Sequence, residues 1–119
     1  MAMILVTHDL GVIAEACDRA MVMYCGKIVE QAPIEELFAR PRHPYSAGLL
    51  ASIPARVDDE RRELPVIPGM VPDLLHLPPG CRFADRCGRR LARCDAEQPG
   101  LAPAGEGRVA CFNPVETPR

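Results

Sequence analysis

Four cysteines in the second half of the chain form a pattern that could do chemistry. Cys81, Cys87, Cys94 and Cys111 are separated by five, six and sixteen residues. Thiolates bind soft metals, and small segments with weak cores commonly depend on a metal or on disulfides. The C-x₂₋₄-C pair typical of zinc is missing, whereas a four-iron, four-sulfur cluster takes cysteines from more varied spacings. From spacing alone, an iron–sulfur cluster, zinc and unligated thiols all stay open.

Arginines are concentrated around the first three of these cysteines. The set is Arg82, Arg86, Arg89, Arg90 and Arg93, opposed mainly by Asp85. Four thiolates on a metal centre carry a net negative charge, so we expect the arginines to stabilise an occupied centre and to lower the thiol pKa values. This argument does not choose between metals, and a patch for an anion or a partner is the alternative.

A histidine follows the first apolar run of the sequence. Residues 2–6 are continuously apolar and predict a strand covered on both faces, and Asp9 is a suitable N-cap for a following helix. Ligands of α/β sheets gather beyond the carboxyl ends of strands, so the His8 imidazole could meet a phosphate or a water molecule. Position alone favours the other interpretation, in which His8 helps to start the helix.

The remaining elements follow from apolar periodicity and from turn residues. The first is a helix with Leu10, Ile13, Ala14 and Cys17 on one face, followed by a hairpin over residues 20–29 that turns at Cys25-Gly-Lys27. A second helix is predicted to start near Pro33, with Ile34, Leu37 and Phe38 on one face. A third helix is predicted over residues 44–53.

Composition divides the chain and limits its function. Of the 13 prolines, 10 lie at or after Pro54, and a charged stretch over residues 55–63 follows Pro54 directly. We expect an α/β piece over residues 1–53, a charged linker over 54–64 and a small, irregular, Pro-rich, cysteine-containing extension over 65–119. A formal net charge of −2 argues against nucleic-acid binding through bulk charge. No apolar run is long enough to span a membrane and no secretory signal is visible, which predicts a cytosolic chain with reduced cysteines.

Several motifs occur in the order of one known family. Residues 4–30 closely resemble the switch-histidine region of ABC transporter ATPases. The likeness continues through Pro41-Arg-His-Pro-Tyr45 and the Leu49-Leu50 helix, and Ile67-Pro-Gly69 and Gly80-Cys-Arg-Phe83 look like the C-terminal extension of ATP-binding subunits of oligopeptide and dipeptide importers. The resemblance implies the tail of a P-loop NTPase-type domain followed by that extension.

The resemblance also implies a function for the matching residues. His8 would contact the γ-phosphate of ATP·Mg or the attacking water, and Cys81, Cys87, Cys94 and Cys111 would hold an iron–sulfur cluster. Partners would be a second ATP-binding subunit and the membrane permease subunits of a peptide importer, with no nucleic acid. The chain would lie peripherally on the cytoplasmic face of the plasma membrane.

Other ATPase motifs are missing from the sequence. A phosphate-binding loop needs G-x-x-x-x-G-K-[ST], but Gly26-Lys27 has Met21 in place of the first glycine and Ile28 in place of Ser or Thr. The signature motif and the Mg²⁺-binding acid are also missing. We therefore expect a truncated or split product, inactive as an ATPase and prone to associate when alone. The alternative is a stand-alone metal-binding interaction module that keeps only the cysteine extension.

Overall fold

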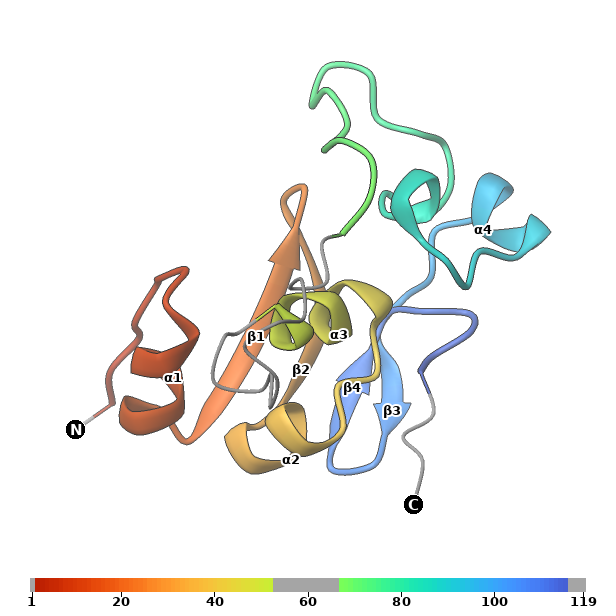
Figure 1. Ribbon diagram of the computed structural model, residues 1–119. Coiled ribbons are helices and arrows are strands. Elements are labelled where there is room, and N and C mark those ends of the chain that lie inside the picture. Colours follow the sequence, from red (N-terminus) through yellow and green to blue (C-terminus); the bar gives the residue numbers. More distant parts are fainter. Residues whose placement is uncertain (1, 53–66, 116–119) are drawn as a thin grey trace, which may run out of the picture.

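A β-hairpin forms the centre of the computed structural model, which describes residues 2–52 and 67–115 (Figure 1). Strands β1 (Arg19–Tyr24) and β2 (Lys27–Pro33) pair antiparallel. Cys25 and Gly26 connect them with φ of 48° and 77°. Positive φ at both central residues matches the twist of a two-residue hairpin, and glycine adopts it without strain. The predicted hairpin is confirmed. The expected linker, 54–64, lies outside the described residues.

A second hairpin from the far end of the chain completes the sheet. Strands β3 (Ala102–Ala104) and β4 (Gly107–Val109) pair with each other, and β4 pairs with β2 in the order β1-β2-β4-β3. Gly107 allows this approach, because a Cβ there would lie 2.1 Å from the Gln31 carbonyl oxygen. Residues on both sides of the predicted linker therefore share one sheet.

Two helices follow β2 and pack beside the hairpin. Helix α2 (Ile34–Ala39) buries Ile34 and Leu37, as its predicted face required. Helix α3 (Pro44–Ala51) begins with proline, whose fixed φ suits a first helical turn. Tyr45 of α3 lies with its ring centroid 4.7 Å from that of Tyr24 on β1. The predicted 44–53 helix is confirmed over Pro44–Ala51, with Ser52 as its C-cap, and Ile53 lies outside the described residues.

The N-terminal segment differs from its prediction. Helix α1 (Leu10–Ala16) starts where expected, with the Asp9 carboxylate accepting from the backbone N–H groups of Gly11 and Val12. Residues 2–6, however, form no strand, and Ile4 and Val6 are 92% and 91% exposed. The predicted buried strand is therefore wrong for this chain. A strand needs a hydrogen-bonded neighbour, and no described strand pairs with this segment.

The cysteine-containing part consists of short elements joined by loops. They include the 3₁₀ turn η2 (Ala84–Arg86) and helix α4 (Ala92–Ala96). Phe83, which precedes η2, packs in one buried cluster with Tyr24 and Val29 of the hairpin. This ring anchors the extension to the sheet. Among the described residues, no helix has the length and apolar character needed to cross a membrane.

Candidate functional site

The four cysteines of the extension line one cavity. Cys81 precedes η2, Cys87 follows it, Cys94 lies in α4 and Cys111 follows β4, and all four border a void of about 10 Å³. Cys94 is buried and the other three are half-buried. The structure thus brings together residues that are up to thirty positions apart in sequence.

Backbone N–H groups point at the sulfur atoms of three of these cysteines. A nearby residue donates in each case: Arg89 N to Cys87 Sγ at 3.3 Å, Leu91 N to Cys94 Sγ at 3.4 Å, and Asn113 N to Cys111 Sγ at 3.4 Å. Hydrogen bonds donated to sulfur favour the thiolate over the thiol. Such bonds to the ligand sulfurs are also among the protein features that tune iron–sulfur clusters.

Gly80 allows the first cysteine to lie against the third. The Cys81 backbone N–H donates to the Cys94 carbonyl oxygen at 2.8 Å. A Cβ on Gly80 would lie 2.1 Å from that same carbonyl oxygen and 2.7 Å from the Asp95 carbonyl carbon. Both contacts are backbone, so a larger residue at 80 would force α4 away from Cys81.

The thiol pKa values run against the expectation from the arginines. Burial raises the pKa of Cys81 and of Cys87, and raises the pKa of Cys111 to about 11. The charges of Arg89 and Arg90 lower the pKa of Cys87, as expected, but burial outweighs them. Desolvation of the thiolate is the largest effect at each of these cysteines, and the neighbouring sulfurs add to it.

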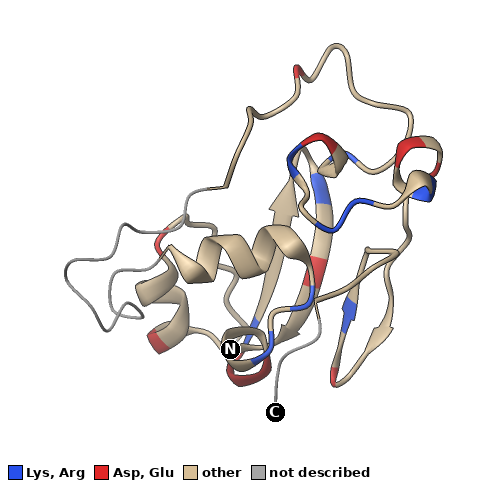
Figure 2. Cartoon of the chain, turned by 45° about the vertical axis from the view of Figure 1, so that its right-hand side comes forward, with Lys and Arg blue, Asp and Glu red and all other residues tan. Residues whose placement is uncertain are grey.

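Several arginines of the extension have partners other than sulfur. Arg90 pairs with Asp95 and Asp85, and Arg93 pairs with Glu97 at 2.8 Å while stacking 4.0 Å from the Phe112 ring. Figure 2 shows basic and acidic residues close together along this part of the chain. Arg89 donates to Asn113 and Pro114, which ties the segment after Cys87 to the segment after Cys111. These arginines hold the cysteine loops together.

The four cysteines supply thiol ligands, but the described structure does not arrange them as a metal site. Among the described residues, no group of three or more His, Cys, Asp and Glu side chains is arranged to hold a metal ion. A tetrahedral zinc site with Zn–S bonds of about 2.3 Å requires sulfurs roughly 3.8 Å apart. A void of about 10 Å³ has room for little more than one water molecule. A larger centre would therefore require the cysteine loops to move apart.

His43 forms part of the cavity wall. Its side chain is 1% exposed, and its Nδ1 accepts from the Tyr45 backbone N–H at 3.0 Å. The ring lies edge-on to Phe83, with centroids 5.7 Å apart. Burial lowers the pKa of His43 to about 4, so the imidazole is neutral at pH 7.

A buried carboxylate positions this histidine. Glu30 of β2 is 2% exposed and accepts from the backbone N–H groups of Arg42 and His43, at 3.0 Å and 2.8 Å. It thereby pairs backbone donors at the start of α3 that have no partner within the helix. Sequence analysis did not single out Glu30. The sequence signal that could have identified Glu30 is a carboxylate within the apolar pattern of β2, a short distance before the start of a helix.

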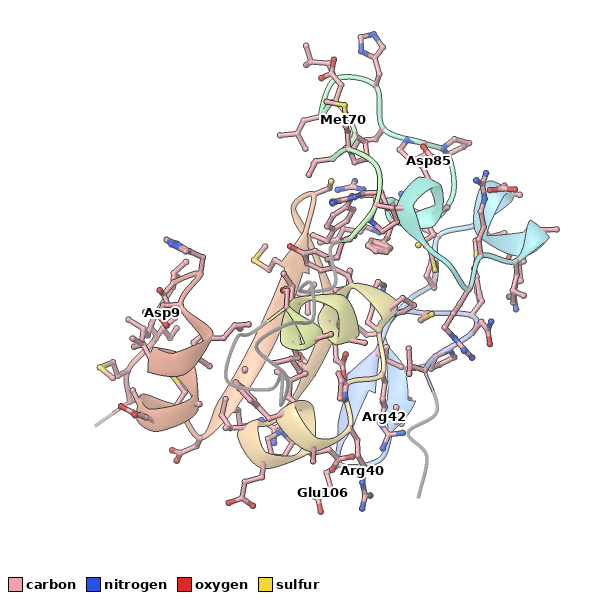
Figure 3. The ribbon with its side chains drawn as sticks, in the orientation of Figure 1. Asp9, Arg40, Arg42, Met70, Asp85 and Glu106 are labelled. Carbon is pink, nitrogen blue, oxygen red and sulfur yellow. The ribbon has the colours of Figure 1, made fainter. Side chains whose placement is uncertain are left out.

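A second carboxylate connects α2 to the C-terminal hairpin. Glu36 Oε1 accepts from Arg42 Nη2 at 2.8 Å, and the Glu36 carboxylate also accepts from the Glu106 backbone N–H at 3.3 Å. Figure 3 shows Arg42 and Glu106 near each other at this end of the molecule. The Arg42 hydrogen bond is the largest of the effects that lower the pKa of Glu36.

His8 lies apart from the cysteine site. It is exposed, it precedes α1, and it is not among the residues that line the cysteine cavity. Asp9 rather than His8 caps the helix, and the Asp9 backbone N–H donates to Thr7 Oγ1 at 3.1 Å. The alternative in which His8 serves as a cap therefore has no support from the hydrogen bonds here.

Comparison with known proteins shows one family. Residues 29–94 match the model of the oligopeptide/dipeptide transporter C-terminal region. The chain is 51% identical over 112 residues to the oligopeptide transport ATP-binding protein AppD of Bacillus subtilis (strain 168), which covers 93% of the chain and 34% of that protein. It is 48% identical over 111 residues to a putative peptide import ATP-binding protein of Brucella abortus (strain 2308), covering 93% of the chain and 33% of that protein.

A third relative gives the same result. A probable peptide ABC transporter ATP-binding protein of Sinorhizobium fredii is 47% identical over 109 residues, covering 92% of the chain and 32% of that protein. The chain thus spans about a third of the length of the curated relatives it matches. The matched family model includes the Glu30–His43 contact and the first three cysteines. On these matches, the chain belongs to the family of the oligopeptide/dipeptide transporter C-terminal region.

Proposed function

We propose that this chain forms the C-terminal part of the ATP-binding subunit of a peptide-importing ABC transporter. The support is the family match together with three relatives whose names describe ATP-binding proteins of peptide or oligopeptide transport. The partners proposed on this basis are a second ATP-binding subunit and the membrane permease subunits. The subunit would lie at the cytoplasmic face of the membrane.

Within that subunit, His8 is the residue proposed to contact the γ-phosphate of ATP·Mg or the attacking water. Its exposure at the end of the apolar 2–6 segment supports this role, since the side chain is available to a neighbouring element. A neutral imidazole can both donate and accept a hydrogen bond. Because the phosphate-binding loop is not in this sequence, the 119 residues alone are expected not to hydrolyse ATP.

The second part of the proposal concerns Cys81, Cys87, Cys94 and Cys111, which we assign to an iron–sulfur cluster. The observation that carries it is that the four side chains border one void and that three of their sulfurs accept backbone hydrogen bonds. When bound, such a cluster would cross-link the loops of the extension and could carry an electron.

A cluster and a single zinc ion make different demands on the four sulfurs. Each thiolate of a four-iron cluster binds a different iron, so its sulfurs lie farther apart than those around one tetrahedral ion. The described residues contain no group arranged for a single ion, yet the four cysteines share one void. Because the void has room for about one water molecule, a cluster requires the cysteine loops to move apart.

The residues around the sulfurs prepare them for deprotonation. Backbone donors at Arg89, Leu91 and Asn113 stabilise the thiolate form, while burial opposes it until a cation arrives. Ligation releases the thiol protons, so loading becomes more favourable as the pH rises. Burial raises the pKa of Cys111 to about 11, so deprotonation of this thiol opposes ligation at neutral pH.

Analysis of the purified protein tests this assignment. Protein prepared without oxygen is expected to contain about four irons and four acid-labile sulfides per chain and to be brown. Zinc at one equivalent, or neither metal, would overturn the assignment. The Cys17→Ser variant is the matched control, because Cys17 does not border the void, and it should contain the same iron as the natural sequence.

A further inference from the structure

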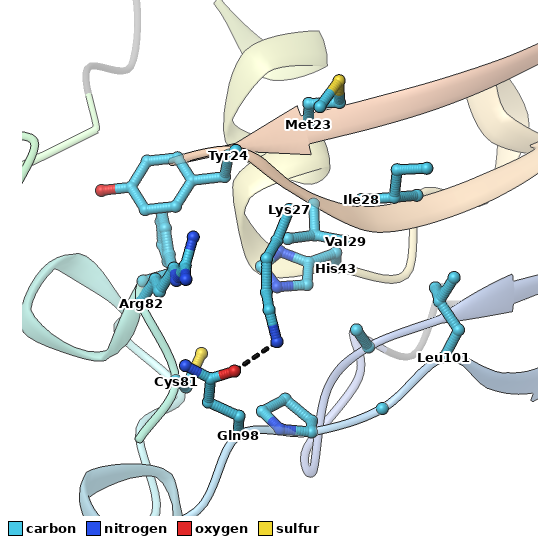
Figure 4. Close-up of a pocket in the computed structure, with 15 residues that line it drawn as sticks. Met23, Tyr24, Lys27, Ile28, Val29, His43, Cys81, Arg82, Gln98 and Leu101 are labelled. Atoms are coloured by element: carbon cyan, nitrogen blue, oxygen red, sulfur yellow. Dashed lines mark hydrogen bonds between the residues drawn. The ribbon is translucent and has the colours of Figure 1, made fainter. Parts of the chain in front are cut away.

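A second and much larger cavity lies beside the cysteine site (Figure 4). Its volume is about 450 Å³, within the range of small-molecule sites in proteins. Most of its wall is apolar and comes from the first hairpin, from the segment before η2 and from residues that flank the second hairpin. The apolar lining includes Met23, Ile28, Val29, Phe83, Leu101 and Ala110.

The charged residues that line this cavity are both cations. Lys27 extends across it from β2, and its ammonium donates to the Gln98 side-chain oxygen. Arg82 donates from Nη1 to the Cys25 carbonyl oxygen, while its Nε is buried with no hydrogen-bond partner. Across residues 2–52 and 67–115, neither side chain forms an ion pair, and no acid lines the cavity.

A buried histidine adds a third donor. His43 lines the cavity and is 1% exposed. Because its Nδ1 accepts from the Tyr45 backbone N–H, the proton of the neutral ring resides on Nε2.

We propose that this cavity binds a small organic anion, a carboxylate on an apolar body, with Lys27, Arg82 and His43 as the groups that receive the carboxylate. The buried Arg82 Nε–H is costly without a partner, and the exposed Lys27 ammonium places a positive charge at the cavity lining with no acid beside it. A carboxylate satisfies both, while the apolar wall receives the remainder of the ligand. A neutral ligand would satisfy neither cation, and an amine would be repelled by both.

This site is separate from the proposed cluster but adjoins it. Cys81, His43, Phe83 and Pro99 line both cavities. A ligand bound beside Lys27 would therefore lie against the residue that carries the first thiol. The proposal does not depend on the cysteines being ligated, because none of its three donors is a cysteine.

The single lysine of the chain provides a direct measurement. Lys27 is the only lysine in the sequence, so reductive methylation with ¹³C-formaldehyde places one lysine side-chain probe in the cavity. Octanoate is expected to shift its NMR signal saturably, with a Kd below about 1 mM. Octanol should bind at least about tenfold more weakly, since it lacks the charge, and octylamine should cause no saturable shift. Added salt should weaken octanoate binding but not octanol binding.

Variants make the test specific to charge in the cavity. In calorimetric titrations with octanoate, Lys27→Met should reduce the affinity about tenfold or more, while Lys27→Arg should restore most of it. Arg108→Met is the matched control, because Arg108 is an exposed cation on β4 outside the cavity lining, and it should bind as the natural sequence does. The amide spectrum of each variant establishes that it is folded.

Several results would overturn the anion site. One is octanoate binding no more tightly than octanol. Another is a folded Lys27→Met variant that binds octanoate as the natural protein does. The absence of saturable octanoate binding would overturn it equally. Iron content is expected to be the same in Lys27→Met and in the natural protein, so failure of the anion site and failure of the cluster assignment can be told apart.

Discussion

The Glu30 carboxylate lies 2.8 Å from the backbone nitrogen of His43 and joins the middle of β2 to the first turn of α3. The same carboxylate accepts from the Arg42 backbone N–H. His43 in turn caps α3 through its ring nitrogen and borders both cavities. The position of one buried acid therefore sets the position of the ring that separates the cysteine site from the larger cavity.

Replacing that acid is expected to destabilise the protein strongly. Glu30→Ala leaves two backbone donors at the start of α3 without their acceptor, and we expect a loss of about 2–4 kcal/mol in the free energy of unfolding. Glu30→Gln keeps one acceptor oxygen and should cost less. Urea unfolding measures both. The exposed Glu35 of α2 provides the control. If Glu30→Ala were no more destabilising than Glu35→Ala, the buried hydrogen bonds would not be needed for stability.

Gly80 is expected to tolerate no side chain. A Cβ at this position overlaps the backbone of α4, so Gly80→Ala should cost about 1–3 kcal/mol and separate Cys81 from Cys94. Gly88→Ala is the matched control, because a Cβ there meets nothing within 4 Å, and it should change stability by less than about 0.5 kcal/mol. Thermal unfolding of the two variants gives the comparison. Equal melting temperatures would show that the close approach at Gly80 is not required.

Stability is expected to fall with acidification because of His43. Its pKa is about 4 in the folded chain, below the ordinary histidine value of about 6.5, so the unfolded state binds the proton more readily between those pH values. The contribution is complete above about pH 6.5 and is lost as the pH falls towards 4, amounting to about 3 kcal/mol.

The variant His43→Asn isolates this effect. Asparagine can still cap α3 but does not titrate, so the slope of unfolding free energy against pH between 6.5 and 4 should become shallower than in the natural protein. His8→Asn is the control, since that histidine is exposed, and its slope should match the natural one. A slope that is unchanged in His43→Asn would contradict a buried neutral imidazole.

His8 is expected to matter for activity and not for folding. In a complete ATP-binding subunit that carries this sequence, His8→Ala should lower the rate of ATP hydrolysis about 10²–10⁴-fold. The unfolding free energy should change by less than about 0.5 kcal/mol, because the side chain is exposed. Steady-state phosphate release measures the rate of ATP hydrolysis, and urea unfolding measures the free energy of unfolding. A His8→Ala subunit with full activity would remove the proposed role.

Local signals in the sequence predicted the hairpin and the helix starts but not the assembly of the sheet. Cys25-Gly-Lys27 between two apolar runs indicated the turn, and Asp9 indicated a cap, because both depend on adjacent residues. Strands β3 and β4 are three residues each and contain proline or glycine. Strand β4 forms on the edge of β2 and β3 on the edge of β4, and no local pattern in the sequence reveals this long-range pairing.

The cysteine site could be predicted only in part, because its geometry also depends on contacts between distant parts of the chain. The residue types and spacing of the four cysteines indicated a thiolate centre, and the structure places all four at one void. The arginines lower the pKa of Cys87 as predicted, but burial outweighs them, and the extent of burial cannot be read from sequence. Arg90 and Arg93 also pair with Asp95 and Glu97. The role of Glu30 was not predicted, because its hydrogen-bond partners are backbone N–H groups. Every residue except proline has such a group, so the sequence does not show which of them Glu30 meets.

The central claim is that four sulfurs from distant parts of the chain act as one site, and the most direct test is iron content across single serine variants. Cys81→Ser, Cys87→Ser, Cys94→Ser and Cys111→Ser are each expected to lose most of the bound iron and the visible absorption, whereas Cys17→Ser keeps both. If one or more of the first four variants kept the full iron and absorption of the natural protein, the four cysteines would not share a single centre.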